Sequence, residues 1–121
     1  MTEEDFLKKL GVKGHLRHSQ RKDFIWLKNN YRIRPDEAFY FEDKVILVEF
    51  ESNKRLVESI SKYWWLYRDT DWRTNQVNLE LHFIILKSHN DEIRERSVQI
   101  LGEELSKQEK SFKFFYYEQK L

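Results

Sequence analysis

The segment from residue 33 to residue 51 constrains the fold more than any other part of the chain. Residues 39–41 and 45–48 are runs of aromatic and aliphatic side chains, mostly of the types that favour extended strands. The polar residues 42–44 between them are typical of a hairpin turn. We therefore predict a pair of antiparallel strands in this part of the chain.

The second of these strands ends in two carboxylates that share one face. Side chains alternate between the faces of a strand, so Glu49 and Glu51 lie about 6.6 Å apart on the same side. Beside an apolar core they repel each other and resist ionisation unless a cation lies between them. A two-residue turn at Asp43-Lys44 predicts that Asp36 faces Glu51, with Glu49 as its diagonal neighbour. Three converging carboxylates favour a hard cation, which predicts a site for Mg²⁺ or Mn²⁺ at Asp36, Glu49 and Glu51.

Patterns along the rest of the chain predict a single α/β domain over residues 1–121. The run at 24–27 is either a short strand or the end of a buried helix. The other elements that we expect are helices over 2–10, 53–69 and from 90 to about 105, and strands over 79–86 and 112–117. The apolar stripe expected on the last helix consists of Ile93, Ser97, Ile100, Leu101 and Leu105. This order predicts a mixed sheet flanked by helices.

Composition excludes several chemistries. The 121 residues contain no cysteine, which excludes disulfides, a thiol nucleophile and a cysteine-ligated zinc site. The net charge of +1 does not exclude binding to nucleic acid, because an acidic cluster cancels basic residues elsewhere in the sum. No apolar run approaches the roughly 20 residues of a membrane helix, and the acidic N-terminus lacks the features of a signal peptide. We therefore expect a cytoplasmic protein with no membrane partner.

The chain contains Arg34-Pro35-Asp36, then a predicted hairpin, then Val48-Glu49-Phe50-Glu51, and then a predicted helix. This order of motifs resembles that of the PD-(D/E)XK nuclease superfamily, which includes many restriction endonucleases and archaeal Holliday junction resolvases. The resemblance implies a restriction-endonuclease-like α-β-β-β-α-β core with a C-terminal α-β, covering most of the chain. It also implies Mg²⁺-dependent or Mn²⁺-dependent hydrolysis of a DNA phosphodiester bond by an activated water, with Asp36 and Glu49 at the acidic positions of the motif.

The chain departs from the motif at Glu51, which occupies the position of the family lysine. Glu51 is then either a general base or a further metal ligand. We expect Lys54 or Arg34 to stabilise the charge that develops on the phosphate. RecB-like members of the superfamily place a Gln and a Tyr four residues apart on the next helix. This chain has Ser59 and Tyr63 at that spacing, and we expect Tyr63 to lie in the core.

Basic side chains on both sides of the motif are candidates for contacts with DNA phosphates. They are Arg17, Arg21, Lys22, Arg34, Lys54 and Arg55. Cleavage of both strands of a duplex requires two active sites, so a homodimer is expected for a duplex or junction substrate.

Two other functions are compatible with the sequence. The absence of the motif lysine favours a catalytically inactive nuclease-like module that binds DNA or a protein. The aromatic side chains Trp65 and Trp72 are candidates for a partner surface, which favours a structural interaction protein with no affinity for divalent metals.

Overall fold

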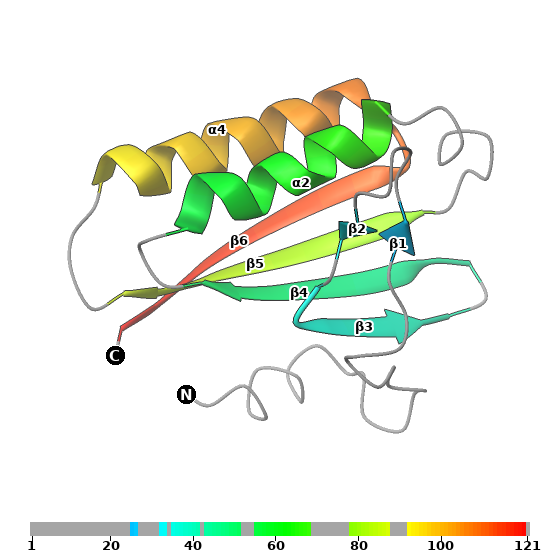
Figure 1. The fold of residues 1–121 in the computed structure, drawn as a ribbon, viewed down its shortest axis with the longest axis horizontal. Helices are drawn as coiled ribbons and strands as arrows, with labels where there is room; N and C mark the ends of the chain where they lie inside the picture. Colours follow the sequence, from blue (N-terminus) through cyan, green and yellow to red (C-terminus); the bar gives the residue numbers. More distant parts are fainter. Residues whose placement is uncertain are drawn as a thin grey trace.

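The described strands form two sheets (Figure 1). The computed structural model describes residues 25–26, 32–33, 35–41, 43–51, 55–68, 78–87 and 92–120. A small antiparallel sheet pairs β1 (Ile25–Trp26) with β2 (Arg32–Ile33), so the run at 24–27 contains a strand. The helix predicted over 2–10 lies outside the described residues.

The larger sheet is mixed, as predicted, and has the order β3-β4-β5-β6. Strand β3 pairs antiparallel with β4, and the pairs β4-β5 and β5-β6 are parallel. The bounds of these strands are Glu37–Tyr40 for β3, Val45–Glu51 for β4, Leu79–Lys87 for β5 and Phe112–Lys120 for β6. Strand β5 is an interior strand, which explains its nearly continuous apolar sequence.

Each parallel pair of strands is joined by a helix, as parallel strands require. Helix α2 (Leu56–Arg68) connects β4 to β5, and α4 (Glu92–Gln108) connects β5 to β6. Figure 1 shows the two helices side by side on one face of the larger sheet. In the described part of the chain, neither helix is long and apolar enough to span a membrane.

The main core lies between these helices and the sheet. Leu47 of β4 and Leu81 and Phe83 of β5 are fully buried there, beside Ile60 of α2. A smaller apolar cluster lies on the opposite face of the sheet and contains Phe39, Ile46, Val48 and Ile84. The alternation predicted for the second strand of the hairpin is therefore confirmed, and Glu49 points to the same face as Leu47, the face that α2 covers.

The hairpin register differs from the prediction by two residues. The observed pairs run from Glu37 opposite Val48 to Tyr40 opposite Val45, and the amide of Phe41 donates to the carbonyl of Lys44 at 2.9 Å. The turn therefore lies between Phe41 and Lys44, one residue earlier than predicted. This register brings Asp36 level with Glu49, and the prediction that Asp36 faces Glu51 is wrong. A shift of two residues leaves every side chain on its predicted face, because the side-chain period of a strand is two.

The stripe predicted for the last helix is partly wrong. Ile93 and Ile100 are 82% and 47% exposed, whereas Leu105 is buried as predicted. The buried face of α4 instead consists of Glu95, Val98, Gly102 and Leu105. Its position follows from a close approach at Gly102, where an added Cβ would lie 2.4 Å from the ring of Phe114 in β6. The helix therefore faces the sheet with Gly102, and its two isoleucines face outward.

Candidate metal centre

The three predicted carboxylates converge beside the first half of α2. Asp36 precedes β3, and Glu49 and Glu51 lie at the end of β4. One carboxylate oxygen from each residue lies within 4.8 Å of those of the other two. Within the described ranges, no other group of three or more metal-ligating side chains comes this close together. The donors are all carboxylate oxygens, which fit a hard divalent cation such as Mg²⁺ or Mn²⁺.

A hydrogen bond to the backbone fixes Asp36 in this cluster. The amide of Phe50 donates to Asp36 Oδ2 at 2.7 Å. Strand β3 begins at Glu37, so the ladder has ended at this level and a side chain accepts the amide hydrogen instead. One oxygen of Asp36 is thereby bound, although the residue as a whole is exposed.

Glu49 is the carboxylate whose charge is hardest to maintain. It is 1% exposed, and burial raises its pKa from 4.5 to about 8. Nearby Lys62 and a hydrogen bond from Tyr63 act in the opposite direction, and the charge of Asp36 adds to the effect of burial. Without a cation in the cluster, Glu49 is therefore mostly protonated at neutral pH.

The other two carboxylates are shifted in the same direction. Burial raises the pKa of Asp36 against the lowering effect of the Phe50 amide. Burial also raises the pKa of Glu51, against the lowering effect of a hydrogen bond from Ser59. All three groups therefore resist carrying negative charge together, and a divalent cation among them removes that cost.

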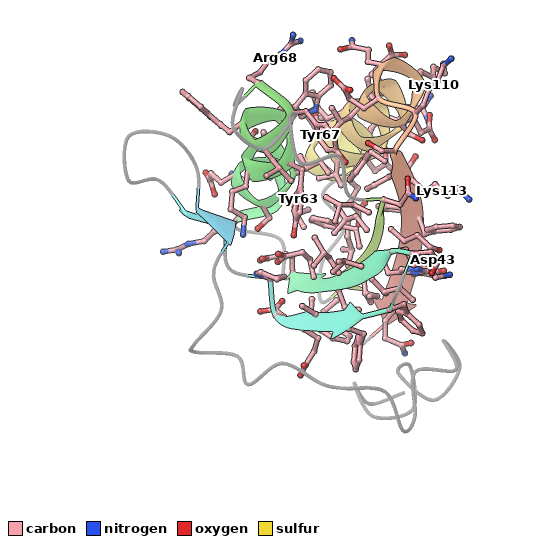
Figure 2. All side chains as sticks on the ribbon, turned by 90° about the vertical axis from the view of Figure 1, so that its right-hand side faces the viewer. Asp43, Tyr63, Tyr67, Arg68, Lys110 and Lys113 are labelled. Atoms are coloured by element: carbon pink, nitrogen blue, oxygen red, sulfur yellow. The ribbon has the colours of Figure 1, made fainter. Side chains whose placement is uncertain are left out.

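Helix α2 contributes three polar side chains to the cluster. Ser59 Oγ donates to Glu51 Oε1 at 2.6 Å, and Tyr63 Oη donates to Glu49 Oε1 at 2.8 Å. Lys62 Nζ lies 3.6 Å from Glu49 Oε1. Positions 59, 62 and 63 lie on one face of a helix, because residues three and four apart are neighbours there. Tyr63 points from α2 towards the sheet in Figure 2 and is fully buried, which confirms that it is a core residue.

Of the basic side chains that were predicted to contact DNA phosphates, Arg55 is among the described residues. Arg55 is exposed immediately before α2, and its charge lowers the pKa of Glu51 against the dominant effect of burial. The other predicted basic residues lie outside the described residues, and these are Arg17, Arg21, Lys22, Arg34 and Lys54.

Sequence reasoning did not find Lys62, and it treated Tyr63 only as a core residue. The signal for both lay in the spacing of polar residues on the helix after the motif. Ser59 and Tyr63 are an i, i+4 pair, and Lys62 is an i+3 neighbour of Ser59. A polar patch on the buried side of an amphipathic helix indicates that the opposing strand also carries polar groups there.

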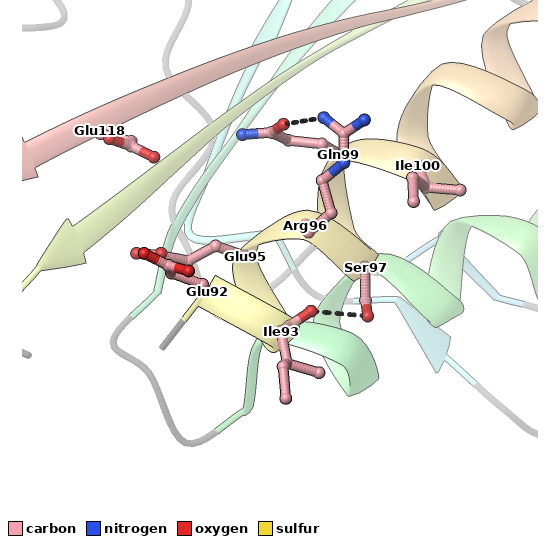
Figure 3. Close-up of a pocket in the computed structure, with 8 residues that line it drawn as sticks. All are labelled: Glu92, Ile93, Glu95, Arg96, Ser97, Gln99, Ile100 and Glu118. Carbon is pink, nitrogen blue, oxygen red and sulfur yellow. Dashed lines mark hydrogen bonds between the residues drawn. The ribbon is translucent and has the colours of Figure 1, made fainter. Parts of the chain in front are cut away.

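An open depression on α4 is separate from this cluster (Figure 3). Its lining includes Glu92, Glu95 and Glu118 together with the apolar side chains of Ile93 and Ile100. None of the three clustered carboxylates contributes to it, so the depression and the candidate metal centre are different places on the molecule.

Comparison of the chain with protein-family profiles, with curated proteins and with solved structures gave no match. The argument for a function therefore depends on the geometry and chemistry of the carboxylate cluster.

Proposed function

We propose that the protein is a small Mg²⁺-dependent endonuclease that hydrolyses DNA phosphodiester bonds. The observation that carries the proposal is the convergence of Asp36, Glu49 and Glu51, with ligand oxygens within 4.8 Å of one another. One of these carboxylates is almost fully buried and has a strongly raised pKa, so the cluster carries its full charge only when a cation is present.

A bound divalent cation would lower the pKa of a coordinated water and polarise a phosphoryl oxygen. In the hydrolysis, the water oxygen forms a new bond to phosphorus, and the bond from phosphorus to the leaving sugar oxygen breaks. The water loses one proton and the leaving oxygen gains one, so no further reactant is needed. In this proposal Glu51 accepts the proton of the water. Its half-buried carboxylate supports this role, because Ser59 donates to one of its oxygens, Oε1, and the other can take the proton.

DNA is proposed as the substrate because of the resemblance to PD-(D/E)XK nucleases. The order β3, β4, α2, β5 supports it, because the carboxylates come from a hairpin and the next helix lies over them. The exposed Arg55 is one basic side chain beside the cluster that can contact a phosphate. Cleavage of both strands of a duplex would require two copies of the protein.

The second candidate function is a non-catalytic module that binds DNA or protein. One observation favours it: Glu51 stands where the motif has a lysine, so β4 itself supplies no lysine to the cluster. This module would bind its partner equally well with and without a divalent cation.

The test is cleavage of labelled duplex, branched and single-stranded DNA in Mg²⁺ or Mn²⁺. We expect cleavage by the wild type and a loss of at least 100-fold in Asp36→Asn and Glu49→Gln, because each variant removes a negatively charged ligand. Glu103→Gln is the matched control, since Glu103 is an exposed glutamate on α4. A folded wild type that binds DNA and cuts none of these substrates would overturn the proposal in favour of the non-catalytic module.

A further inference from the structure

The structure assigns Lys62 a catalytic role: its ammonium contacts a non-bridging oxygen of the scissile phosphate and stabilises the charge that develops there. This inference rests on the proposed phosphodiester hydrolysis and names the cation that the end of β4 lacks. It assigns the role to α2, whereas the sequence pointed to Lys54 or Arg34.

Lys62 lies beside the buried carboxylate of the cluster. Its Nζ lies 3.6 Å from Glu49 Oε1, and within the described ranges no other lysine or arginine forms an ion pair with the three clustered carboxylates. Its side chain is 34% exposed, whereas that of Glu49 is 1% exposed. The side chain of Lys62 is therefore reached by solvent, whereas the carboxylate beside it is not.

Glu49 does not need Lys62 as its hydrogen-bond partner. Tyr63 Oη donates to the same oxygen, Glu49 Oε1, at 2.8 Å. At 3.6 Å the ammonium is close enough for charge attraction and too far for a good hydrogen bond. The contact of Tyr63 with Glu49 thus persists when Lys62 moves.

The length and charge of the Lys62 side chain suit contact with a phosphate. A lysine side chain is a point charge on a flexible four-carbon stem, and phosphate oxygens are among its usual partners. A divalent cation bound by Glu49 repels the ammonium of Lys62 and turns it away from that carboxylate. The ammonium can then bind an oxygen of the phosphate without any rearrangement of α2.

The test compares Lys62→Met and Lys62→Arg with wild type in single-turnover cleavage at saturating DNA, and measures Mn²⁺ affinity by calorimetry. We expect Lys62→Met to lower the rate on the order of 100-fold, as the loss of one donor to a developing oxyanion does. Its Mn²⁺ affinity should be equal to or higher than that of wild type, because a competing cation has been removed. Lys62→Arg should retain an intermediate rate, and Lys107→Met, at an exposed lysine of α4, should cleave like wild type.

Three results would overturn the assignment, and they differ in what else they affect. Cleavage by Lys62→Met within about 3-fold of wild type would remove the role of Lys62 and leave the proposed hydrolysis intact. A slower Lys62→Met that has also lost Mn²⁺ affinity would show that Lys62 acts only through the structure of the metal centre. A wild type that binds Mn²⁺ and cleaves nothing would overturn the proposed function itself, and the role of Lys62 with it.

Discussion

The buried carboxylate of Glu49 should make the metal-free protein less stable as the pH rises. Its pKa is raised from 4.5 to about 8 by burial, so folding is accompanied by proton uptake between these two values. The contribution of the group to the free energy of unfolding is therefore fully present below pH 4.5 and is lost as the pH rises through 8. At about 1.4 kcal/mol per unit of pKa shift, the total is about 5 kcal/mol. That is a large fraction of the roughly 5–15 kcal/mol that stabilises a typical domain.

The replacement Glu49→Gln isolates this effect, because glutamine resembles the protonated acid and still accepts a hydrogen bond from Tyr63. We expect the variant and the wild type to have similar free energies of unfolding at pH 5. At pH 8.5 the variant should be more stable by about 4 kcal/mol, the part of the linkage that falls between these two pH values. Asp36 and Glu51 also have raised pKa values, and the part of their contribution that does not depend on the charge of Glu49 is the same in both proteins.

The assay is urea unfolding followed by tryptophan fluorescence at pH 5, 7 and 8.5, with a chelator present. The exposed glutamate variant Glu103→Gln is the control and should follow the wild type at every pH. Addition of Mg²⁺ in place of the chelator should restore stability to the wild type at pH 8.5, because a ligand that binds only the folded state stabilises it. A difference between Glu49→Gln and wild type that is the same at pH 5 and pH 8.5 would refute the reasoning.

Three further predictions concern the metal centre and the packing of α4. Glu49 must lose a proton to bind a cation, so Mn²⁺ affinity should rise roughly 50-fold from pH 6 to pH 8, with nearly one proton released per ion at pH 7. Calorimetry in buffers of different ionisation enthalpy measures the affinity and the number of protons released. An affinity that does not change with pH would contradict this prediction. Tyr63→Phe removes the hydrogen bond that opposes the raised pKa of Glu49, so the pH at which Mn²⁺ binding is half-maximal should move upward in the same experiment. Gly102→Ala should lower the free energy of unfolding by about 1–3 kcal/mol, because its Cβ overlaps the ring of Phe114; an increase in stability would show that helix propensity outweighs the overlap.

The carboxylate cluster was predictable because it depends on the parity of residues in strands. Glu49 and Glu51 share a face in any strand, and Asp36 joins them in any hairpin register that differs by an even number of residues. The turn position could not be obtained from the same pattern, because the predicted turn and the observed turn place the same side chains on the same faces. Backbone pairing selects the observed turn, with the amide of Phe41 bonded to the carbonyl of Lys44.

The contribution of α2 was harder to predict, because it depends on how the helix is rotated against the sheet. The sequence pattern located the helix and led us to expect Tyr63 in the core, which the structure confirms. Whether Lys62 points to solvent or to the carboxylates is decided by tertiary packing, since it lies at the edge of the buried face. Helix α4 shows the same limit, because the contact of Gly102 with Phe114 sets its orientation and leaves Ile93 exposed.

The most direct measurement is anomalous diffraction from crystals of the protein soaked in Mn²⁺. The account predicts an anomalous peak among Asp36, Glu49 and Glu51, within about 2.5 Å of an oxygen of each, as for hard cations bound by carboxylates. Lys62 Nζ should lie farther from Glu49 than the 3.6 Å found without the ion. A well-ordered cluster with no peak, or a peak only at surface carboxylates such as those of Glu92 and Glu118, would contradict the claim that these three residues form a metal centre.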